Sequence, residues 1–145
     1  MEIKTLLEQR GLLIFDGAMG TQLQAKGLKT GETPELLNLT AKDLLKEIHR
    51  SYIDAGADII SANTFGANSY KLSHSGKSVD EIITAGIINC KEAIKESGKD
   101  VFCALDIGPI GQLLEPTGSL KFEEAYDIFK EEIVAGYKAG ADGVL

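Results

Sequence analysis

The sequence predicts an α/β fold: the amino-terminal half of a TIM (β/α)8 barrel, with about four strand–helix units and a cut in the fourth strand. Short, almost continuously apolar segments recur along the chain, with amphipathic helical patterns between them. Strands of this kind are typical of parallel sheets that are covered on both faces. Polar or glycine-rich clusters follow the first three strands, where the loops of a barrel carry its chemistry.

Four apolar segments are predicted to be strands. They comprise residues 12–15, 58–62, 101–105 and 143–145. Because parallel strands need a right-handed crossover between them, the units form either an open doubly wound sheet or a closed barrel. A nucleotide-binding open sheet has Gly-x-Gly-x-x-Gly after its first strand, whereas residues 16–21 are Asp-Gly-Ala-Met-Gly-Thr. A barrel is therefore favoured, with loops 16–21, 63–68 and 106–111 meeting at one mouth.

Three amphipathic helices are predicted, each with an apolar stripe and a terminating glycine. Their bounds are Thr40 as N-cap to Gly56, Ser78 with its capping-box partner Glu81 to Gly98, and a start near Ser119 to Gly140. The stripes comprise Leu44, Ile48 and Tyr52, then Ile83, Ile87, Cys90 and Ile94, then Phe122, Tyr126, Phe129, Ile133 and Tyr137. Gly86 lies inside the second helix, where it costs on the order of 1 kcal/mol relative to alanine.

A short repeat indicates regular strand–helix units. Ala-Gly-Ala-Asp occurs at residues 55–58 and again at 139–142, and each copy ends a helix, turns on glycine and enters an apolar strand. One further strand lies midway, which implies roughly 42 residues per unit and over roughly 300 residues for eight units. Residues 1–145 are therefore interpreted as the amino-terminal part of a barrel domain whose remainder is absent.

Composition and charge limit the possible function. The 145-residue chain is 43% apolar and 26% charged, which indicates one ordered domain or part of a larger one. Its formal net charge of -7 argues against a nucleic-acid-binding surface. No apolar run is long enough to span a membrane, and residues 1–4 do not resemble a secretory signal. We expect a cytoplasmic enzyme with no nucleic-acid or membrane partner.

Asp16 is a candidate for substrate contact, because it stands where an apolar strand ends. It can accept hydrogen bonds from loop amides or bind the ammonium group of a substrate. Gly17 and Gly20 leave room for a closely approaching ligand. Asn63 both donates and accepts hydrogen bonds, so it can orient a small polar substrate or brace a neighbouring loop. The loop at 106–111 is interpreted as shaping the pocket floor.

The two cysteines and two histidines of the chain show no metal-binding pattern. Cys90 and Cys103 have neither metal spacing nor a disulfide framework, and we expect them to be buried small hydrophobes. His49 and His74 belong to no His-Glu-x-x-His or similar arrangement. The sequence therefore predicts no metal ligand and no catalytic residue within this chain.

Four motifs in register resemble the opening of the homocysteine S-methyltransferase family. They are Asp16-Gly17-Ala18-Met19-Gly20-Thr21, Pro34-Glu35-Leu36-Leu37-Asn38, Ala57-Asp58-Ile59-Ile60 with Asn63-Thr64-Phe65, and Asp106-Ile107-Gly108-Pro109. The resemblance extends over almost the whole chain and is closest to the homocysteine-binding barrel of cobalamin-dependent methionine synthase. The betaine-dependent branch has an aromatic residue after Thr-Phe, whereas this sequence has Gly66.

The resemblance implies a methyltransferase that binds homocysteine for zinc-assisted methyl transfer to its sulfur, forming methionine. It places Asp16, Gly17, Asn63 and Thr64 in the substrate site, with Asp16 holding the amino acid part of homocysteine. The zinc ligands are expected beyond Leu145. Cobalamin and methyltetrahydrofolate are expected on other modules of the full-length protein, with methylcobalamin as methyl donor. On this interpretation the chain alone is inactive.

Two other functions remain open at the level of sequence. The chain could be half of another TIM-barrel enzyme, such as a pterin-binding methyltransferase, or a non-catalytic half-barrel that assembles with a partner. In each case we expect the isolated chain to self-associate, because the outer edges of its first and fourth strands are unpaired. Side chains that face the barrel interior, with Ile60 and Phe102 as examples, are expected to lack an opposite wall.

Overall fold

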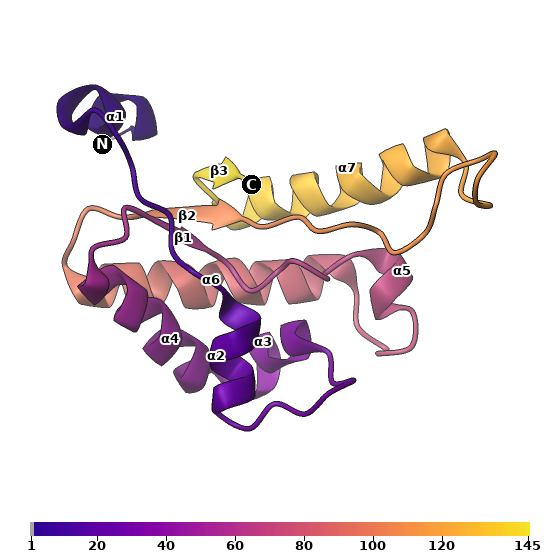
Figure 1. The fold of residues 1–145 in the computed structure, drawn as a ribbon, viewed down its shortest axis with the longest axis horizontal. Coiled ribbons are helices and arrows are strands. Elements are labelled where there is room, and N and C mark those ends of the chain that lie inside the picture. The colour runs from indigo at the N-terminus through magenta and orange to yellow at the C-terminus, as the bar shows by residue number, and fades with distance from the viewer. Residues whose placement is uncertain (1) are drawn as a thin grey trace.

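A computed structural model describes residues 2–145 and shows a small parallel sheet covered by helices (Figure 1). The sheet has the order β1-β2-β3, with bounds Ile59–Ser61, Phe102–Leu105 and Gly143–Val144. All pairs are parallel, with Ile59 opposite Phe102 and Ala104 opposite Gly143. Three of the four predicted strands are therefore confirmed, although each is shorter than predicted.

The predicted first strand, residues 12–15, is not a regular strand. Only Phe15 forms a parallel bridge, to Ile59. Three backbone hydrogen bonds flank it: the Ile14 carbonyl accepts from the amides of Asp58 and Ile59, and the Asp16 amide donates to the Ile59 carbonyl. The segment has one neighbour only among residues 2–145, and Leu12, Ile14 and Phe15 are exposed.

Eight helical segments accompany the sheet within residues 2–145. Their bounds are α1 Ile3–Arg10, α2 Met19–Ala25, the 3-10 turn η1 Pro34–Leu36, α3 Leu37–Thr40, α4 Lys42–Ala55, α5 Ser69–Leu72, α6 Val79–Ser97 and α7 Phe122–Ala139. Ser78 caps α6 as predicted, by accepting a hydrogen bond from the Glu81 amide. Thr40 is instead the last residue of α3, and Ala41 precedes α4. The helices α4, α6 and α7 end at glycines with φ of 106°, 66° and 90°, the left-handed conformation predicted for them.

The main core lies between α6 and the sheet. The predicted stripe of α6 is buried at Ile83, Ile87 and Cys90, which pack in one cluster with Ile60 and Cys103 of the strands. Figure 1 shows α6 running along one side of the strands, with α4 packed beside it. The buried side of α4 is rotated from the prediction. It comprises Leu45, Ile48, His49 and Ile53, while Leu44 and Tyr52 are only half-buried.

Gly86 has a packing reason inside α6. A Cβ atom at this position would lie 2.8 Å from Asn38 Nδ2 and 3.0 Å from Thr64 Cγ2. The glycine therefore lets α3 and the loop after β1 approach the helix backbone closely. This close packing offsets the loss of helix propensity that glycine causes.

The predicted stripe of α7 is not its buried face. Phe122, Tyr126, Ile133 and Tyr137 are exposed, and the buried residues are instead Ala125, Glu132, Ala135 and Gly136. A Cβ atom at Gly136 would lie 2.6 Å from a methyl group of Leu105 in β2. Small residues thus allow α7 to approach the sheet, and the large apolar residues point elsewhere. The predicted stripe is therefore present in the sequence of α7 but is not buried, except that Phe129 is half-buried.

The other side of the sheet is covered by α1. Leu6 packs there against Ile59, Phe102 and Ala104, and Figure 1 shows α1 on the side of the strands opposite α6. Phe102 is only 8% exposed, so its expected lack of a covering wall is wrong. Ile60 was also misplaced, because it faces α6 in the main core.

The aspartate of each Ala-Gly-Ala-Asp repeat fixes the neighbouring strand position. Asp58 Oδ2 accepts a hydrogen bond from the Ile14 amide at 2.9 Å, and Arg10 forms an ion pair with the same carboxylate. In the second copy, Asp142 Oδ2 accepts from the Cys103 amide at 2.8 Å. The repeat therefore encodes both a helix end and a bond that sets strand register.

Glu132 is predicted to lower the free energy of unfolding as the pH rises from about 4.5 to about 7. Both of its carboxylate oxygens are buried without a hydrogen-bond partner among residues 2–145. Burial raises the pKa of Glu132 from 4.5 to about 7, although the positive charge of Lys71 opposes this. The unfolded chain loses this proton near pH 4.5, whereas the folded chain keeps it until about pH 7. Stability is therefore lost as the pH rises through that window.

The substitution Glu132→Gln removes this titration while keeping the shape of the side chain. We expect the variant to be more stable than the wild type by roughly 1–3 kcal/mol at pH 8, and by much less at pH 4.5. Urea unfolding at both pH values measures the difference. Burial lowers the pKa of His49 to about 4, but His49 is present in both proteins and its effect cancels. An equal stability difference at both pH values would contradict the prediction.

Candidate functional site

The loops that follow the strand positions are joined to one another at one end of the sheet. Thr64 Oγ1 donates to the Asp106 carbonyl at 2.8 Å and accepts from the Asp106 amide at 3.1 Å. The Gly108 amide donates to the Phe65 carbonyl at 3.0 Å. The loops after β1 and β2 therefore form one unit, as expected at the mouth of a barrel.

The side chain of Asp16 is held in place at this end by a single residue of β1. Its Oδ2 accepts from the Ser61 amide and its Oδ1 accepts from the Ser61 hydroxyl, both at 2.9 Å. Burial raises the pKa of Asp16, and the two bonds from Ser61 oppose that shift. Each oxygen retains a free lone pair, so this half-buried carboxylate can still accept hydrogen bonds from a ligand.

Gly17 is fitted to a side chain of α4. A Cβ atom at Gly17 would lie 2.9 Å from the ring of Tyr52, whose hydroxyl donates to the Ala18 carbonyl at 3.0 Å. Any larger residue would push this ring away. The glycine therefore keeps the loop after the first strand position close to α4.

Asn63 and Thr64 are buried, and their polar atoms are bonded to the chain itself. Asn63 Nδ2 donates to the Pro34 carbonyl at 2.9 Å and to Asn38 Oδ1 at 3.0 Å. Thr64 is fully buried, with its hydroxyl bonded to Asp106. Of the two roles considered for Asn63, these contacts fit the bracing of a neighbouring loop.

The segment 34–38 contributes two buried polar residues that the sequence analysis did not single out. Glu35 Oε1 accepts from the Gly66 amide at 2.6 Å, and a Cβ atom at Gly66 would lie 2.7 Å from that oxygen. Asn38 Nδ2 donates to the carbonyls of Asn63 and Ile82. The available signal was the position of Glu35 and Asn38 on either side of the apolar pair Leu36-Leu37. Polar side chains that are buried beside apolar ones are normally hydrogen-bonded.

Three carboxylates give the mouth a negative potential. The pKa of Asp106 is raised by burial and, secondarily, by the negative charges of Asp16 and Glu35. The ring of Phe65 is 52% exposed beside them, and Lys71 Nζ lies 5.6 Å from its centroid. An ammonium group is attracted to such a site, whereas a free anion is repelled.

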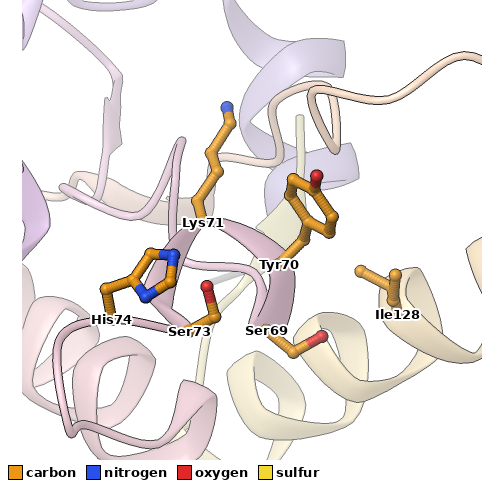
Figure 2. Close-up of a pocket in the computed structure, with 6 residues that line it drawn as sticks. All are labelled: Ser69, Tyr70, Lys71, Ser73, His74 and Ile128. Atoms are coloured by element: carbon orange, nitrogen blue, oxygen red, sulfur yellow. The ribbon is translucent and has the colours of Figure 1, made fainter.

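Two open hollows adjoin the mouth. One, of about 430 Å³, is lined by residues 32–35 together with Phe65, Gly66 and Lys71. Figure 2 shows the other, of about 670 Å³, which is formed by side chains of α5 and the following turn, with Ile128 contributed by α7. Of the three carboxylates, Glu35 lines the first hollow, whereas Asp16 and Asp106 line neither.

The residues present do not fit a catalytic zinc ion. Residues 2–145 contain no group of three histidine, cysteine or acidic side chains placed to hold a metal, whereas a catalytic zinc takes three protein ligands. Cys90 and Cys103 are both buried, as predicted. The neighbouring thiol of Cys103, together with burial, raises the pKa of Cys90 well above its usual value, and a protonated thiol is a poor metal ligand.

No helix within residues 2–145 combines the length and the apolar character needed to cross a membrane.

Comparison with known proteins confirms the resemblance that the motifs predicted. The sequence model described as Homocysteine S-methyltransferase matches residues 13–145. Methionine synthase from Mycobacterium tuberculosis (strain ATCC 25618 / H37Rv) is 30% identical over 155 residues, which cover 99% of this chain and 13% of that protein. Methionine synthase from Mycobacterium leprae (strain TN) is 31% identical over 150 residues, covering 96% and 12%. The chain therefore spans only a small part of these relatives.

A solved structure shows the same fold. The homocysteine methyltransferase MmuM from Escherichia coli, in both its oxidised and its metallated form, aligns with a TM-score of 0.85 at 20% identity. The alignment covers 98% of this chain and 55% of that chain. The small parallel sheet thus corresponds to a fragment of a homocysteine methyltransferase barrel.

The bond from Ser61 to Asp16 leads to a prediction about the acidity of the site. Because the Ser61 hydroxyl stabilises the carboxylate, Ser61→Ala should raise the pKa of Asp16 further. Ser61→Thr, which keeps a hydroxyl and suits a strand, should leave the pKa close to the wild-type value. Carbon NMR titration of the Asp16 carboxyl group measures both variants. An identical titration in Ser61→Ala and the wild type would show that the hydroxyl has no influence.

Proposed function

We propose that this chain, which belongs to the homocysteine S-methyltransferase family, forms the amino-terminal half of a barrel that methylates the sulfur of homocysteine to give methionine. In this proposal residues 1–145 are the first part of the barrel domain, and the chain alone is inactive. The observation that carries the proposal is the position of Asp16 at the acidic mouth, with both oxygens bonded to Ser61.

Asp16 is proposed to bind the ammonium group of homocysteine. The carboxylate is preorganised by β1, so it loses little conformational freedom when substrate binds. The nearby charges of Glu35 and Asp106 add to the attraction for a cation. Gly17, Asn63 and Thr64 are proposed to shape this side of the substrate site, chiefly by holding the mouth loops in position.

The remaining chemistry is assigned to residues outside this chain. Zinc would be held there, and it would keep the substrate thiol deprotonated near neutral pH. Cobalamin and methyltetrahydrofolate would bind to further modules, with methylcobalamin as the methyl donor. We place the full-length protein in the cytoplasm and expect the isolated chain to self-associate.

The first consequence concerns metal content. We expect the purified 145-residue chain to hold no stoichiometric zinc, because its buried thiols and scattered histidines offer no three-ligand site. Elemental analysis after dialysis against zinc measures this directly. One tightly held zinc ion per chain would place metal ligands within residues 1–145 and contradict the proposal.

The second consequence concerns substrate affinity in the full-length protein. Asp16→Asn removes the charge that pairs with the ammonium group and should weaken homocysteine binding by roughly ten- to a hundredfold. Zinc content should stay unchanged, since Asp16 is not a metal ligand in this proposal. Asp127→Asn, at an exposed position of α7, is the matched control and should bind normally. Unchanged affinity in Asp16→Asn would assign this residue to loop structure only.

A further inference from the structure

One hollow beside the mouth has the chemistry of a site for a small organic cation. We name it the Phe65 hollow. It has a volume of about 430 Å³ and is lined by residues 32–35 together with Phe65, Gly66 and Lys71. An aromatic face beside acidic side chains is the combination that attracts a methylated ammonium or sulfonium ion. Asp16, the residue proposed to bind the homocysteine ammonium group, does not line this hollow.

The acidic side of the Phe65 hollow is fixed by backbone amides. Glu35 is only 5% exposed, and its Oε1 accepts from the Gly66 amide at 2.6 Å. Glu32 Oε2 accepts from the Lys29 amide at 2.8 Å. Neither carboxylate forms an ion pair within residues 2–145. The two acidic groups therefore give the hollow a negative potential that favours a cation.

The aromatic side is the ring of Phe65, which is 52% exposed. Its loop is joined to the loop after β2, because the Phe65 carbonyl accepts from the Gly108 amide at 3.0 Å. A Cβ atom at Gly108 would lie 2.8 Å from the ring, so this glycine lets the ring lie against the second loop. The ring is thus supported on one side and open to a cation on the other.

Lys71 takes the place of that cation. Its Nζ lies 5.6 Å from the centroid of the Phe65 ring, within the distance at which an ammonium group is attracted to an aromatic face. A Cβ atom at Gly111 would lie 3.6 Å from Lys71 Cε, so the lysine side chain runs beside the loop after β2. Figure 2 shows this side chain extending away from Ser73 and His74.

The Phe65 hollow lies close to the other acidic groups of the mouth. Burial, followed by the negative charges of Asp16 and Glu35, raises the pKa of Asp106. Glu35 lines the hollow, so the hollow lies within electrostatic range of the mouth. A methyl donor held there would stand beside the proposed homocysteine site.

We propose that the Phe65 hollow is a site for a small onium ion and that Lys71, as its built-in occupant, keeps such ions out. Methylated ammonium and sulfonium ions can give a methyl group to a thiolate, because the bond to the methyl group breaks to release a neutral amine or sulfide. The occupied ring face and the like charge of Lys71 both oppose their binding, which is specificity by repulsion.

Lys71 is therefore a specificity-determining residue. It rejects small onium donors, so that a methyl group carried on a corrinoid can approach the mouth without their competition. This step rests on the proposed function, whereas the occupancy of the hollow by Lys71 does not.

Binding of tetramethylammonium to the full-length protein tests the inference. Lys71→Ala frees the ring face and removes the like charge, so we expect it to bind this ion roughly three- to thirtyfold more tightly than the wild type. Lys71→Arg keeps a cation beside the ring and should match the wild type. Saturation-transfer NMR of the tetramethylammonium methyl signal, at constant ionic strength, measures the dissociation constants.

Two controls separate the ring from a general effect of charge. Lys77→Ala loses the same charge from an exposed position that is paired with Glu81, and it should bind tetramethylammonium as the wild type does. Adding Phe65→Leu to Lys71→Ala should remove the gain in affinity, because the aromatic face is lost. Equal affinities in Lys71→Ala and Lys77→Ala, or a gain that persists without Phe65, would overturn the inference.

Homocysteine methylation by methylcobalamin is assayed with the wild-type protein, so that the two proposals can fail separately. Tighter binding of tetramethylammonium to Lys71→Ala, in a protein that does not methylate homocysteine, would leave the occupied onium site valid and refute the proposed function. Methylation without any gain in tetramethylammonium binding would do the reverse.

Discussion

The close approach of three elements at Gly86 is the constraint on which the mouth of this structure depends. Asn38 of α3 lies against the bare backbone of α6 and donates to the carbonyls of Ile82 and Asn63. Asn89 of α6 donates in turn to the Asn38 carbonyl. A buried polar network of this kind is favourable only when its members are bonded, and a side chain at position 86 would separate them.

The rest of the mouth is built outward from that point. Because Asn38 and Asn63 are fixed, the segment 34–38 is held where Glu35 meets the Gly66 amide. The same loop carries Thr64, whose hydroxyl is bonded to the backbone of Asp106. Asp16 is positioned separately, by the register bond of Asp58 and by Ser61 of β1. Two independent sets of bonds thus bring the acidic groups of the mouth together.

Much of this architecture could be predicted from the sequence, because its signals are local. Glycine at a helix end and an apolar run entering a strand depend on neighbouring residues only, and Gly56, Gly98 and Gly140 behave as predicted. The Ala-Gly-Ala-Asp repeat correctly predicted a helix end followed by a strand, but it did not predict the role of its aspartate. That role needs the amide of Ile14 or Cys103 from a distant strand, which no local pattern reveals.

The errors arose where a pattern does not identify the neighbour. The spacing of apolar residues in α7 correctly predicts an amphipathic helix. The buried side, however, carries Ala125, Ala135 and Gly136, because small side chains allow the helix to approach its neighbours closely. The cover of Phe102 by α1 depends on Leu6, a residue far away in sequence. The structure places Asp16 at the mouth, where its position at a strand end put it, and its role in binding substrate stays a prediction. Glu35 and Asn38 were not singled out, because their bonds to Gly66 and Asn63 join segments far apart in the sequence.

The burial of apolar side chains differs between the α1 side of the sheet and the outer side of α7. On the side of α1, a few buried contacts around Leu6 already supply a wall, so the strand residues there are less exposed than an open half-barrel would suggest. On the outer side of α7, the large side chains of Phe122, Tyr126, Ile133 and Tyr137 remain exposed to water. Fully burying one such side chain contributes about 1.5–3 kcal/mol, while a whole domain has a net stability of only about 5–15 kcal/mol. Leaving several such side chains in water therefore forgoes an amount of free energy comparable to a large part of a domain's net stability.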